Sequence, residues 1–576
     1  MGIKIFQIRR IILLSIFIIA ILIRKYNDPN LPFHYDPGKN IVYSRAILDS
    51  FPLFPQYNPY FNLGEYYDYQ VLFPYMVAVL HKITGFSLVD LTSWSIITIG
   101  SLMVITIYLL SLEIFDNILA GLISAFLISI SKIQLFSYMN YYPQITALML
   151  SPISFIFLIR YIRTTNRKYL AYTSILFGAI ILSSYLVGIV YLFLLIASLI
   201  IYSIIKKEFR YINTLITILI GTLALITFYV LPIINRYGIK QFIIGMTGAI
   251  FIQKDIPFTN ANFLQNDITI LKTFGSLIII TLIISISLIL YLNKLEKFKV
   301  NIDKIKYEYV LLSVWILVSL ILIESYRFRP LLWVDRYIEL LEIPIIIIAG
   351  YSIYFIINKL TNDLRINKKI ILILILIIVF IYPTYDIVRH NYRFAHWDTS
   401  SDLKALEYVQ KNISSESLFV APSGITTFWV SALGGIHMLG GESSQILGER
   451  FDGNGYSDTI INSPNVEEKM NLIRKFGVQY IYLTVRIGYP SLWRNDYNLE
   501  GLKAFDDKRY FEPIYRTRDR FTTVYIIKVK DDFKPKYNRP NIDKKMTILG
   551  YVISLVTLTV MIIMSYSIYP KKGNEI

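Results

Sequence analysis

The run Tyr169–Lys206 reads YLAYTSILFGAIILSSYLVGIVYLFLLIASLIIYSIIK and is almost entirely apolar. A bilayer core about 30 Å thick is crossed by roughly 20 helical residues, so this run is too long for one span. Basic residues flank both of its ends, with Arg167 and Lys168 before it and Lys207 after it. Because short basic loops stay in the cytoplasm, the run crosses the membrane twice, and we expect its turn at Leu182–Tyr185.

Other apolar runs follow along the chain, and together they predict about twelve transmembrane helices. The remaining spans are expected at Ile5–Ile23, Thr92–Leu112, Ile118–Leu135, Ile145–Tyr161, Ile212–Ile234, Leu271–Leu292, Tyr307–Ile323, Tyr337–Ile357, Ile370–Pro383 and Thr547–Ile568. The run Val71–Ile83 is shorter, and counting it as a span would break the alternation of basic loops. We therefore assign it to a helix at the membrane surface.

The composition agrees with a membrane protein and excludes a cytosolic enzyme. Of 576 residues, 55% are hydrophobic and only 17% are charged. The formal net charge of +17 lies largely in short loops between apolar runs, so it marks the cytoplasmic side rather than a nucleic-acid partner. The chain has no cysteine, which excludes disulfides, thiolate metal sites and a cysteine nucleophile.

Three parts follow from these patterns: a multi-span membrane part (1–386) with outer loops 26–91 and 235–270, an extracytoplasmic domain (387–545), and a last span with a short cytoplasmic tail (546–576). Both termini are then cytoplasmic. The extracytoplasmic domain is expected to be a small α/β domain. Helices are predicted at Asp402–Asn412 and Val466–Phe476, and strands at Ser417–Ala421, Val478–Val485 and Phe521–Val529.

The first outer loop carries the best candidates for chemistry. Asp36 follows the first span by about ten residues, where a rigid element can hold a carboxylate for acid–base work or for a divalent cation such as Mg or Mn. Glu65 and Asp68 are further acids of the same loop, and His34 stands just before Asp36. The alternative is that these acids only solubilise an exposed loop.

A second group of candidates is basic. Arg327, Arg329 and Arg336 lie in or beside the outer connector 325–337, against the inside bias of basic residues in this chain. Arginine binds phosphate in a bidentate way that lysine cannot match, so we take these three as candidates for a lipid phosphate. The alternative is pairing with the acids Asp335, Glu339 and Glu342, which follow on one helix face, or anchoring to lipid headgroups.

The stretch 34–40 (HYDPGKN), followed by Gly64-Glu65 and by Leu72-Phe73-Pro74-Tyr75, resembles the first outer loop of the GT-C glycosyltransferases. These include the catalytic subunits of oligosaccharyltransferases and the protein O-mannosyltransferases. The segment 333–350 is similar to the Arg-plus-aromatic start of a late span in that superfamily, and 403–435 to the start of its outer domain. The resemblance covers nearly the whole chain as architecture.

The resemblance implies that Asp36 is the acceptor-activating or metal-binding carboxylate. Two departures stand against an oligosaccharyltransferase reaction and against a metal. No Trp-Trp-Asp signature follows Val420, where only Thr427-Phe428-Trp429-Val430 stands, and the second outer loop 136–144 (FSYMNYYPQ) contains no acid. Trp429 and His437, the latter in a glycine-rich turn, are candidates for the acceptor side of the pocket; His437 is otherwise a surface loop residue.

The sequence thus predicts a membrane glycosyltransferase that takes a sugar from a polyprenyl-phosphate donor and transfers it to a protein or glycolipid acceptor on the outer face. No nucleic acid is expected as a partner. The rival is a polytopic transporter or lipid flippase without covalent chemistry, which would carry charges and broken helices near the membrane midplane. A catalytically inactive membrane anchor for the outer domain is a third possibility.

Overall fold

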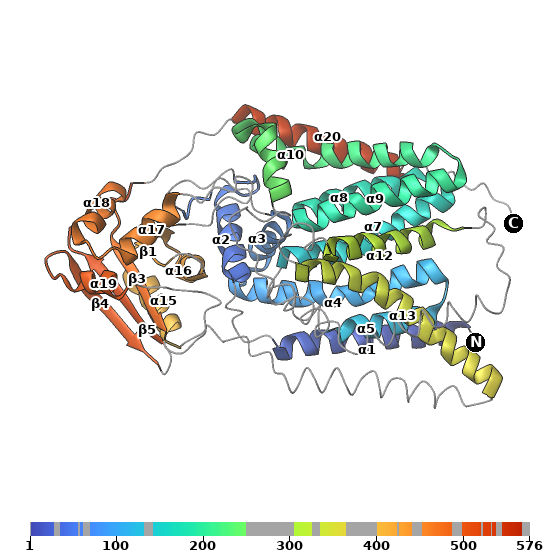
Figure 1. Ribbon diagram of the computed structural model, residues 1–576, viewed down its shortest axis with the longest axis horizontal. Coiled ribbons are helices and arrows are strands. Elements are labelled where there is room, and N and C mark those ends of the chain that lie inside the picture. Colours follow the sequence, from blue (N-terminus) through green and yellow to red (C-terminus); the bar gives the residue numbers. More distant parts are fainter. Residues whose placement is uncertain are drawn as a thin grey trace.

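The computed structural model describes residues 2–27, 35–55, 58–61, 70–131, 142–248, 305–324, 334–364, 400–422, 425–440, 452–486, 498–519, 522–531, 533–536 and 544–566. A bundle of long helices makes up most of the molecule, and a sheet with short helices stands at one end of it (Figure 1). The helices of the bundle are α1 (Gly2–Asn27), α4 (Leu88–Phe115), α5 (Ile118–Ser129), α7 (Tyr142–Thr164), α8 (Arg167–Ser183), α9 (Tyr185–Lys206), α10 (Arg210–Gly248, with a non-helical kink at Gly238), α12 (Tyr307–Glu324), α13 (Val334–Leu364) and α20 (Lys544–Tyr566).

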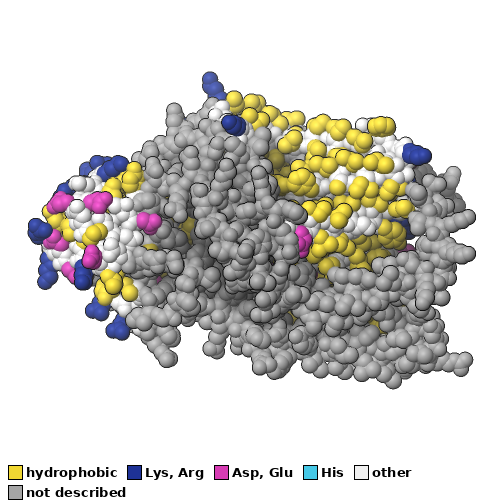
Figure 2. Space-filling view, viewed as in Figure 1, with side chains coloured by type: hydrophobic (Ala, Val, Ile, Leu, Met, Phe, Trp, Pro, Cys, Tyr) yellow, Lys and Arg dark blue, Asp and Glu magenta, His cyan; other side chains and the backbone are white. Residues whose placement is uncertain are grey.

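Seven helices in the described part of the chain are long and apolar enough to cross a membrane. They belong to α4, α7, α9, α10, α12, α13 and α20. Figure 2 shows hydrophobic side chains gathered over the bundle surface, as expected for a surface that faces lipid. The spans predicted at Leu271–Leu292 and Ile370–Pro383 lie outside the described residues, so the total of about twelve remains a prediction.

The long apolar run Tyr169–Lys206 folds as two helices, as predicted. Helix α8 ends at Ser183 and α9 begins at Tyr185. Ser184 between them is extended, with φ −156° and ψ 117°, and its side chain accepts a hydrogen bond from the Val187 amide. This side-chain cap satisfies a free N–H at the start of α9.

The first loop contains two helices, of which only the second matches a predicted one. Helix α3 (Leu72–Thr84) covers the expected apolar run and ends at Gly85, whose φ of 73° requires glycine or strain. Helix α2 (Tyr35–Ser50) is an addition to the predicted loop. Ser44 of α2 donates hydrogen bonds to the carbonyls of Asn40 and of Pro74 in α3, at 2.7 and 3.0 Å. The two helices therefore pack against each other.

The sheet has five strands in the order β2-β1-β3-β5-β4. Strands β2 (His437–Met438), β1 (Leu418–Val420) and β3 (Tyr480–Arg486) are parallel, whereas β5 (Thr522–Val529) is antiparallel to β3 and to β4 (Phe511–Arg518). The helices around it are α15 (Ser400–Asn412), α16 (Ile425–Gly434), α17 (Asp452–Asn462), α18 (Val466–Phe476) and α19 (Leu499–Lys503), with a 3-10 turn at Ala504–Asp506. We call residues 400–536 the α/β region.

Most predicted elements of the α/β region are present. Helix α18 has the predicted bounds because Asn465 caps its start and Gly477, with φ 72°, ends it. The expected strands correspond to β1, β3 and β5, and the expected first helix to α15. The division of the chain into domains and the side of the membrane on which this region lies remain predictions.

The first loop also joins the sheet. Phe61 forms a parallel bridge with Met438 of β2, and the Met438 amide donates to the Tyr60 carbonyl at 2.8 Å. A single hydrophobic core runs from the bundle into the near face of the α/β region and includes Phe61, Phe428 and Trp429. The other face of the sheet has a separate core. This continuous packing fixes the first loop between the bundle and the sheet.

Candidate functional site

We call the end of the bundle that faces the α/β region the near end; helices α7 and α13 begin there (Figure 1). We call the opposite end the far end; helices α4 and α7 end there and α12 begins there. Asp36 lies at the near end in the first turn of α2. Pro37 fits this turn because the first helical N–H groups have no partner inside the helix. The side chain of Asp36 lies outside the described residues, so its position is known from the helix backbone alone.

The turn that carries Asp36 packs against Trp429 of α16. A Cβ atom built on Gly38 would lie 3.1 Å from Cε2 and Nε1 of Trp429, closer than ordinary van der Waals contact. The indole therefore lies directly over the glycine, and it is only 4% exposed. Two of the predicted site residues, Asp36 and Trp429, thus belong to segments that the fold brings together.

Lys39 is a buried cation of the same helix and is not among the residues that the sequence predicts for the site. It is 1% exposed, and its ammonium lies 5.9 Å from the Tyr43 ring and 5.8 Å from the Phe428 ring. Aromatic faces attract cations at such distances. Lys39 follows Asp36 by three residues, so both positions lie on one side of α2. This spacing is the sequence signal that could have identified Lys39 as part of the candidate site.

His437 is part of a contact between the first loop and the α/β region. Its ring stacks on Tyr60 with centroids 5.5 Å apart, and its Nδ1 lies 2.8 Å from the Pro59 carbonyl oxygen. On the other side of this contact, Arg45 of α2 donates to the Ala432 carbonyl at 3.0 Å. These described contacts give His437 a structural role, and nothing in them tests its predicted role in the acceptor pocket.

Asp49 completes this contact. The Tyr60 hydroxyl donates to Asp49 Oδ2 at 3.0 Å. Burial raises the pKa of Asp49, while the hydrogen bond from Tyr60 and the charge of Arg45 oppose that shift. Burial and the neighbouring Asp49 carboxylate raise the pKa of Tyr60 above its ordinary value, so Tyr60 keeps its proton and remains the donor.

Helix α13 begins at the near end and carries the third group of polar residues. Arg336 is half-buried in its first turn, and Glu339 and Glu342 are each 1% exposed. Gln144 of α7 donates to Glu339 Oε2 at 2.6 Å, and Ser131 donates to Glu342. The sequence indicates the acids on this helix face but not these neutral partners, because the pairs come from segments far apart in the chain.

Five of the predicted site residues lie outside the described residues: His34, Glu65, Asp68, Arg327 and Arg329. The described residues contain no group of three or more His, Asp or Glu side chains that could hold a metal ion. Because the side chains of Asp36, Glu65 and Asp68 are not among them, the predicted divalent cation remains a prediction.

Several solved structures of membrane glycosyltransferases resemble this chain. Oligosaccharyltransferase AglB from Archaeoglobus fulgidus, in complex with an inhibitory peptide and a dolichol-phosphate, matches with a TM-score of 0.52 and 14% identity, over 82% of this chain and 69% of that chain. ArnT from Cupriavidus metallidurans bound to undecaprenyl phosphate matches with a TM-score of 0.57 and 11% identity, over 89% and 97%. Arabinofuranosyltransferase AftD from Mycobacteria matches with a TM-score of 0.56 and 12% identity, over 91% and 40%.

These structures are GT-C glycosyltransferases, so the chain has the GT-C fold, as the sequence resemblance predicted. The apolar helices and this fold make it a multi-pass membrane protein. No model of a protein family matches the sequence, and no curated protein matches it either.

Proposed function

We propose that this protein is a glycosyltransferase that takes a sugar from a polyprenyl-phosphate donor and transfers it to a protein or glycolipid acceptor. The observation that carries the proposal is a GT-C fold in which the first turn of α2, with Asp36, packs under Trp429 at the near end. AglB and ArnT have been solved with dolichol-phosphate and undecaprenyl phosphate, which supports a donor of this class.

In the proposed reaction, Asp36 takes the proton from an acceptor hydroxyl, or orients an acceptor amide. The acceptor atom forms a bond to the anomeric carbon of the sugar, and the bond from that carbon to the phosphate oxygen breaks with inversion. The phosphate leaves on its polyprenyl chain. Glu65 and Asp68 are the alternative bases.

The leaving phosphate gains negative charge as this bond breaks, and a fixed cation lowers the barrier. We assign this role to Arg336, with Arg327 or Arg329. Arg336 stands in the first turn of α13, whose free N–H groups also favour an anion. His34, Trp429 and His437 are proposed for the acceptor side.

We place the near end and the α/β region on the outer face of the membrane. The basic connectors 160–168 and 206–210 lie at the far end, and basic loops of this kind stay in the cytoplasm. Both termini are then cytoplasmic, in keeping with the predicted topology.

The test compares surface glycoproteins and glycolipids, by mass spectrometry, between a strain that lacks the gene and strains that carry the wild type or Asp36→Asn. We expect Asp36→Asn to lower transfer by about 10²- to 10⁴-fold, the usual contribution of a general base. Asp506→Asn is the control, because it changes the same residue type at an exposed position outside α2. An Asp36→Asn protein that is inserted and fully active would overturn the assignment. A glycan pattern that does not change on deletion of the gene would favour the rival transporter.

A further inference from the structure

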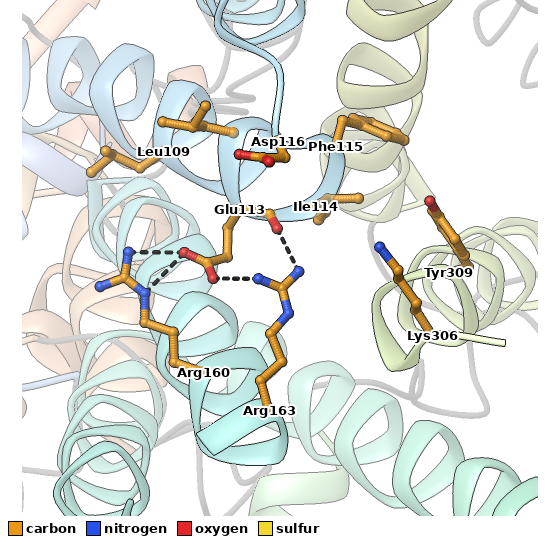
Figure 3. Close-up of a pocket in the computed structure, with 10 residues that line it drawn as sticks. Leu109, Glu113, Ile114, Phe115, Asp116, Arg160, Arg163, Lys306 and Tyr309 are labelled. Carbon is orange, nitrogen blue, oxygen red and sulfur yellow. Dashed lines mark hydrogen bonds and ion pairs between the residues drawn. The ribbon is translucent and has the colours of Figure 1, made fainter. Parts of the chain in front are cut away.

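A polar pocket lies at the far end of the bundle, away from the α/β region. It has a volume of about 380 Å³, within the range of about 300–1,000 Å³ that is common for small-ligand sites. The last turns of α4 and α7 and the first turn of α12 form its walls (Figure 3). All three helices are candidate membrane spans, so their ends place the pocket at the depth of the lipid headgroups.

Ion pairs between these helices form one wall of the pocket. Arg160 contacts Glu113 Oε2 through Nε at 2.9 Å and Nη2 at 2.8 Å. Arg163 contacts Glu113 Oε1 through Nη1 at 2.9 Å and also pairs with Glu308 of α12. Figure 3 shows Glu113 held between the two arginines. This network neutralises Glu113 and ties the three helices together.

Two charged groups of the pocket have no ion pair among the described residues: Lys306 and Asp116, both exposed. Lys306 directly precedes α12, whose first turn already carries the carboxylate of Glu308. The pocket thus offers the ammonium of Lys306 for a phosphate and the carboxylate of Asp116 for a cation.

The remaining lining is apolar and reaches the lipid-facing surface. Leu109 of α4 lines the pocket and is 41% exposed, and Tyr309 of α12 lines it and is 45% exposed. Exposed leucine on a span faces acyl chains, and tyrosine is enriched at the membrane interface. The residues that line the pocket are therefore polar on one side and apolar towards the lipid-facing surface, as the binding of an amphiphilic ligand requires.

We propose that this pocket binds a membrane phospholipid whose headgroup carries both a phosphate and an amine. The phosphate lies at Lys306, the amine lies at Asp116, and an acyl chain follows Leu109. By the placement of basic connectors, the lipid belongs to the cytoplasmic leaflet. The proposal does not depend on the glycosyltransferase assignment, which concerns the near end.

The test measures lipid retention by native mass spectrometry on the delipidated full-length protein in detergent. The ligands are phosphatidylethanolamine, phosphatidylglycerol, which has no amine, and soluble phosphoethanolamine, which has no acyl chains. We expect the wild type to retain phosphatidylethanolamine at least threefold better than phosphatidylglycerol, and soluble phosphoethanolamine hardly at all.

Two variants separate the parts of the site. Lys306→Ala should lower retention of both lipids several-fold, and Asp116→Asn should remove the preference for phosphatidylethanolamine while phosphatidylglycerol still binds. Lys207→Ala is the matched control, an exposed lysine at the far end that does not line the pocket. All three variants should melt at the temperature of the wild type.

Two outcomes would overturn the proposal. If Lys306→Ala retains lipid as the wild type does, the pocket is not the phosphate site. If soluble phosphoethanolamine binds as well as the lipid, the ligand is a soluble phosphate compound and the lipid assignment is wrong.

Discussion

Two buried charged groups, one at the far end of the bundle and one in the α/β region, are held by different kinds of partner. Glu308 of α12 is 2% exposed and pairs with the guanidinium of Arg163. Lys469 of α18 is fully buried, and its ammonium donates to the carbonyls of Ile460 and Ile461 at 2.5 and 2.9 Å. The first charge is balanced by an opposite charge and the second by neutral dipoles.

The difference determines what each group is sensitive to. Removal of one partner of such an ion pair lowers the free energy of unfolding, because the other partner keeps its charge in a partly desolvated site. A buried cation with neutral partners is sensitive to pH, because burial favours its uncharged form. Burial lowers the pKa of Lys469 to about 7, although the nearby Glu468 opposes that shift.

The largest expected effect is the pH dependence that Lys469 causes. Between pH 7 and the ordinary lysine pKa near 10.5, the unfolded chain binds a proton at this residue that the folded chain has released. Stability should therefore rise with pH in this window, by up to about 1.4 kcal/mol per pH unit. Below pH 7 both states are protonated and the cost of burying the charge is fully present.

Thermal unfolding of the full-length protein in detergent at pH 7, 8 and 9 checks this prediction. The gain in stability of Lys469→Met over the wild type should be greatest at pH 7 and should shrink as the pH rises. Lys475→Met, at an exposed position on the same helix, is the control and should show no such trend. A gain that stays constant with pH would show that Lys469 does not change its charge in this range.

The next effect is the loss of the ion pair at the far end. Glu308→Gln leaves Arg163 with one acid fewer, but that arginine is 41% exposed and keeps Glu113. We therefore expect a loss of about 2 kcal/mol in the free energy of unfolding, below the 3–5 kcal/mol typical of a fully buried pair. Thermal unfolding measures it.

Glu208→Gln is the control for this prediction, because it removes one partner of an exposed pair with Arg210. It should cost about 0.5 kcal/mol or less. Equal losses of stability in the two variants would mean that burial adds nothing to the Glu308–Arg163 contact. The contrast between a buried ion pair at the far end and a buried lysine in the α/β region would then be wrong for the ion pair.

Local signals made much of the fold predictable. A helix cap at Asn465, a helix-ending Gly477 and the basic flanks of the α8–α9 run are all encoded within a few residues of the feature that they determine. Helix α2 is not predicted, because the features that stabilise it are not encoded locally. It is polar, starts next to Pro37 and Gly38, and owes its burial to α3, α4 and α16, which lie elsewhere in the sequence.

The same difference between local signals and tertiary packing applies to the candidate site. Trp429 was named as a candidate, but its place over Gly38 depends on the packing of α16 against α2. The hydrogen bond from Gln144 to Glu339 joins residues that are 195 positions apart, and no local pattern reports such a pair. The sequence thus offers candidates by residue type, whereas their partners depend on tertiary contacts.

The smallest expected effect is that of the contact between position 435 and a third cation, Arg45, which donates to a neutral carbonyl and is only partly buried. Its Nη1 lies 2.6 Å from the Cβ that an alanine would have at position 435, where the backbone φ is 67°. Gly435→Ala should therefore cost backbone strain of about 1–2 kcal/mol and, in addition, about 0.5–1 kcal/mol for moving the guanidinium.

Two comparisons isolate the part that is due to Arg45. Gly85→Ala has a similar φ of 73° with nothing within 4 Å of the new Cβ, so it should cost the backbone strain alone. In an Arg45→Ala background, the additional cost of Gly435→Ala should disappear, which a double-mutant cycle on thermal unfolding can measure. If the cycle shows no coupling, the guanidinium moves without loss, and the contact between α2 and the α/β region depends on Trp429 and Tyr60 instead.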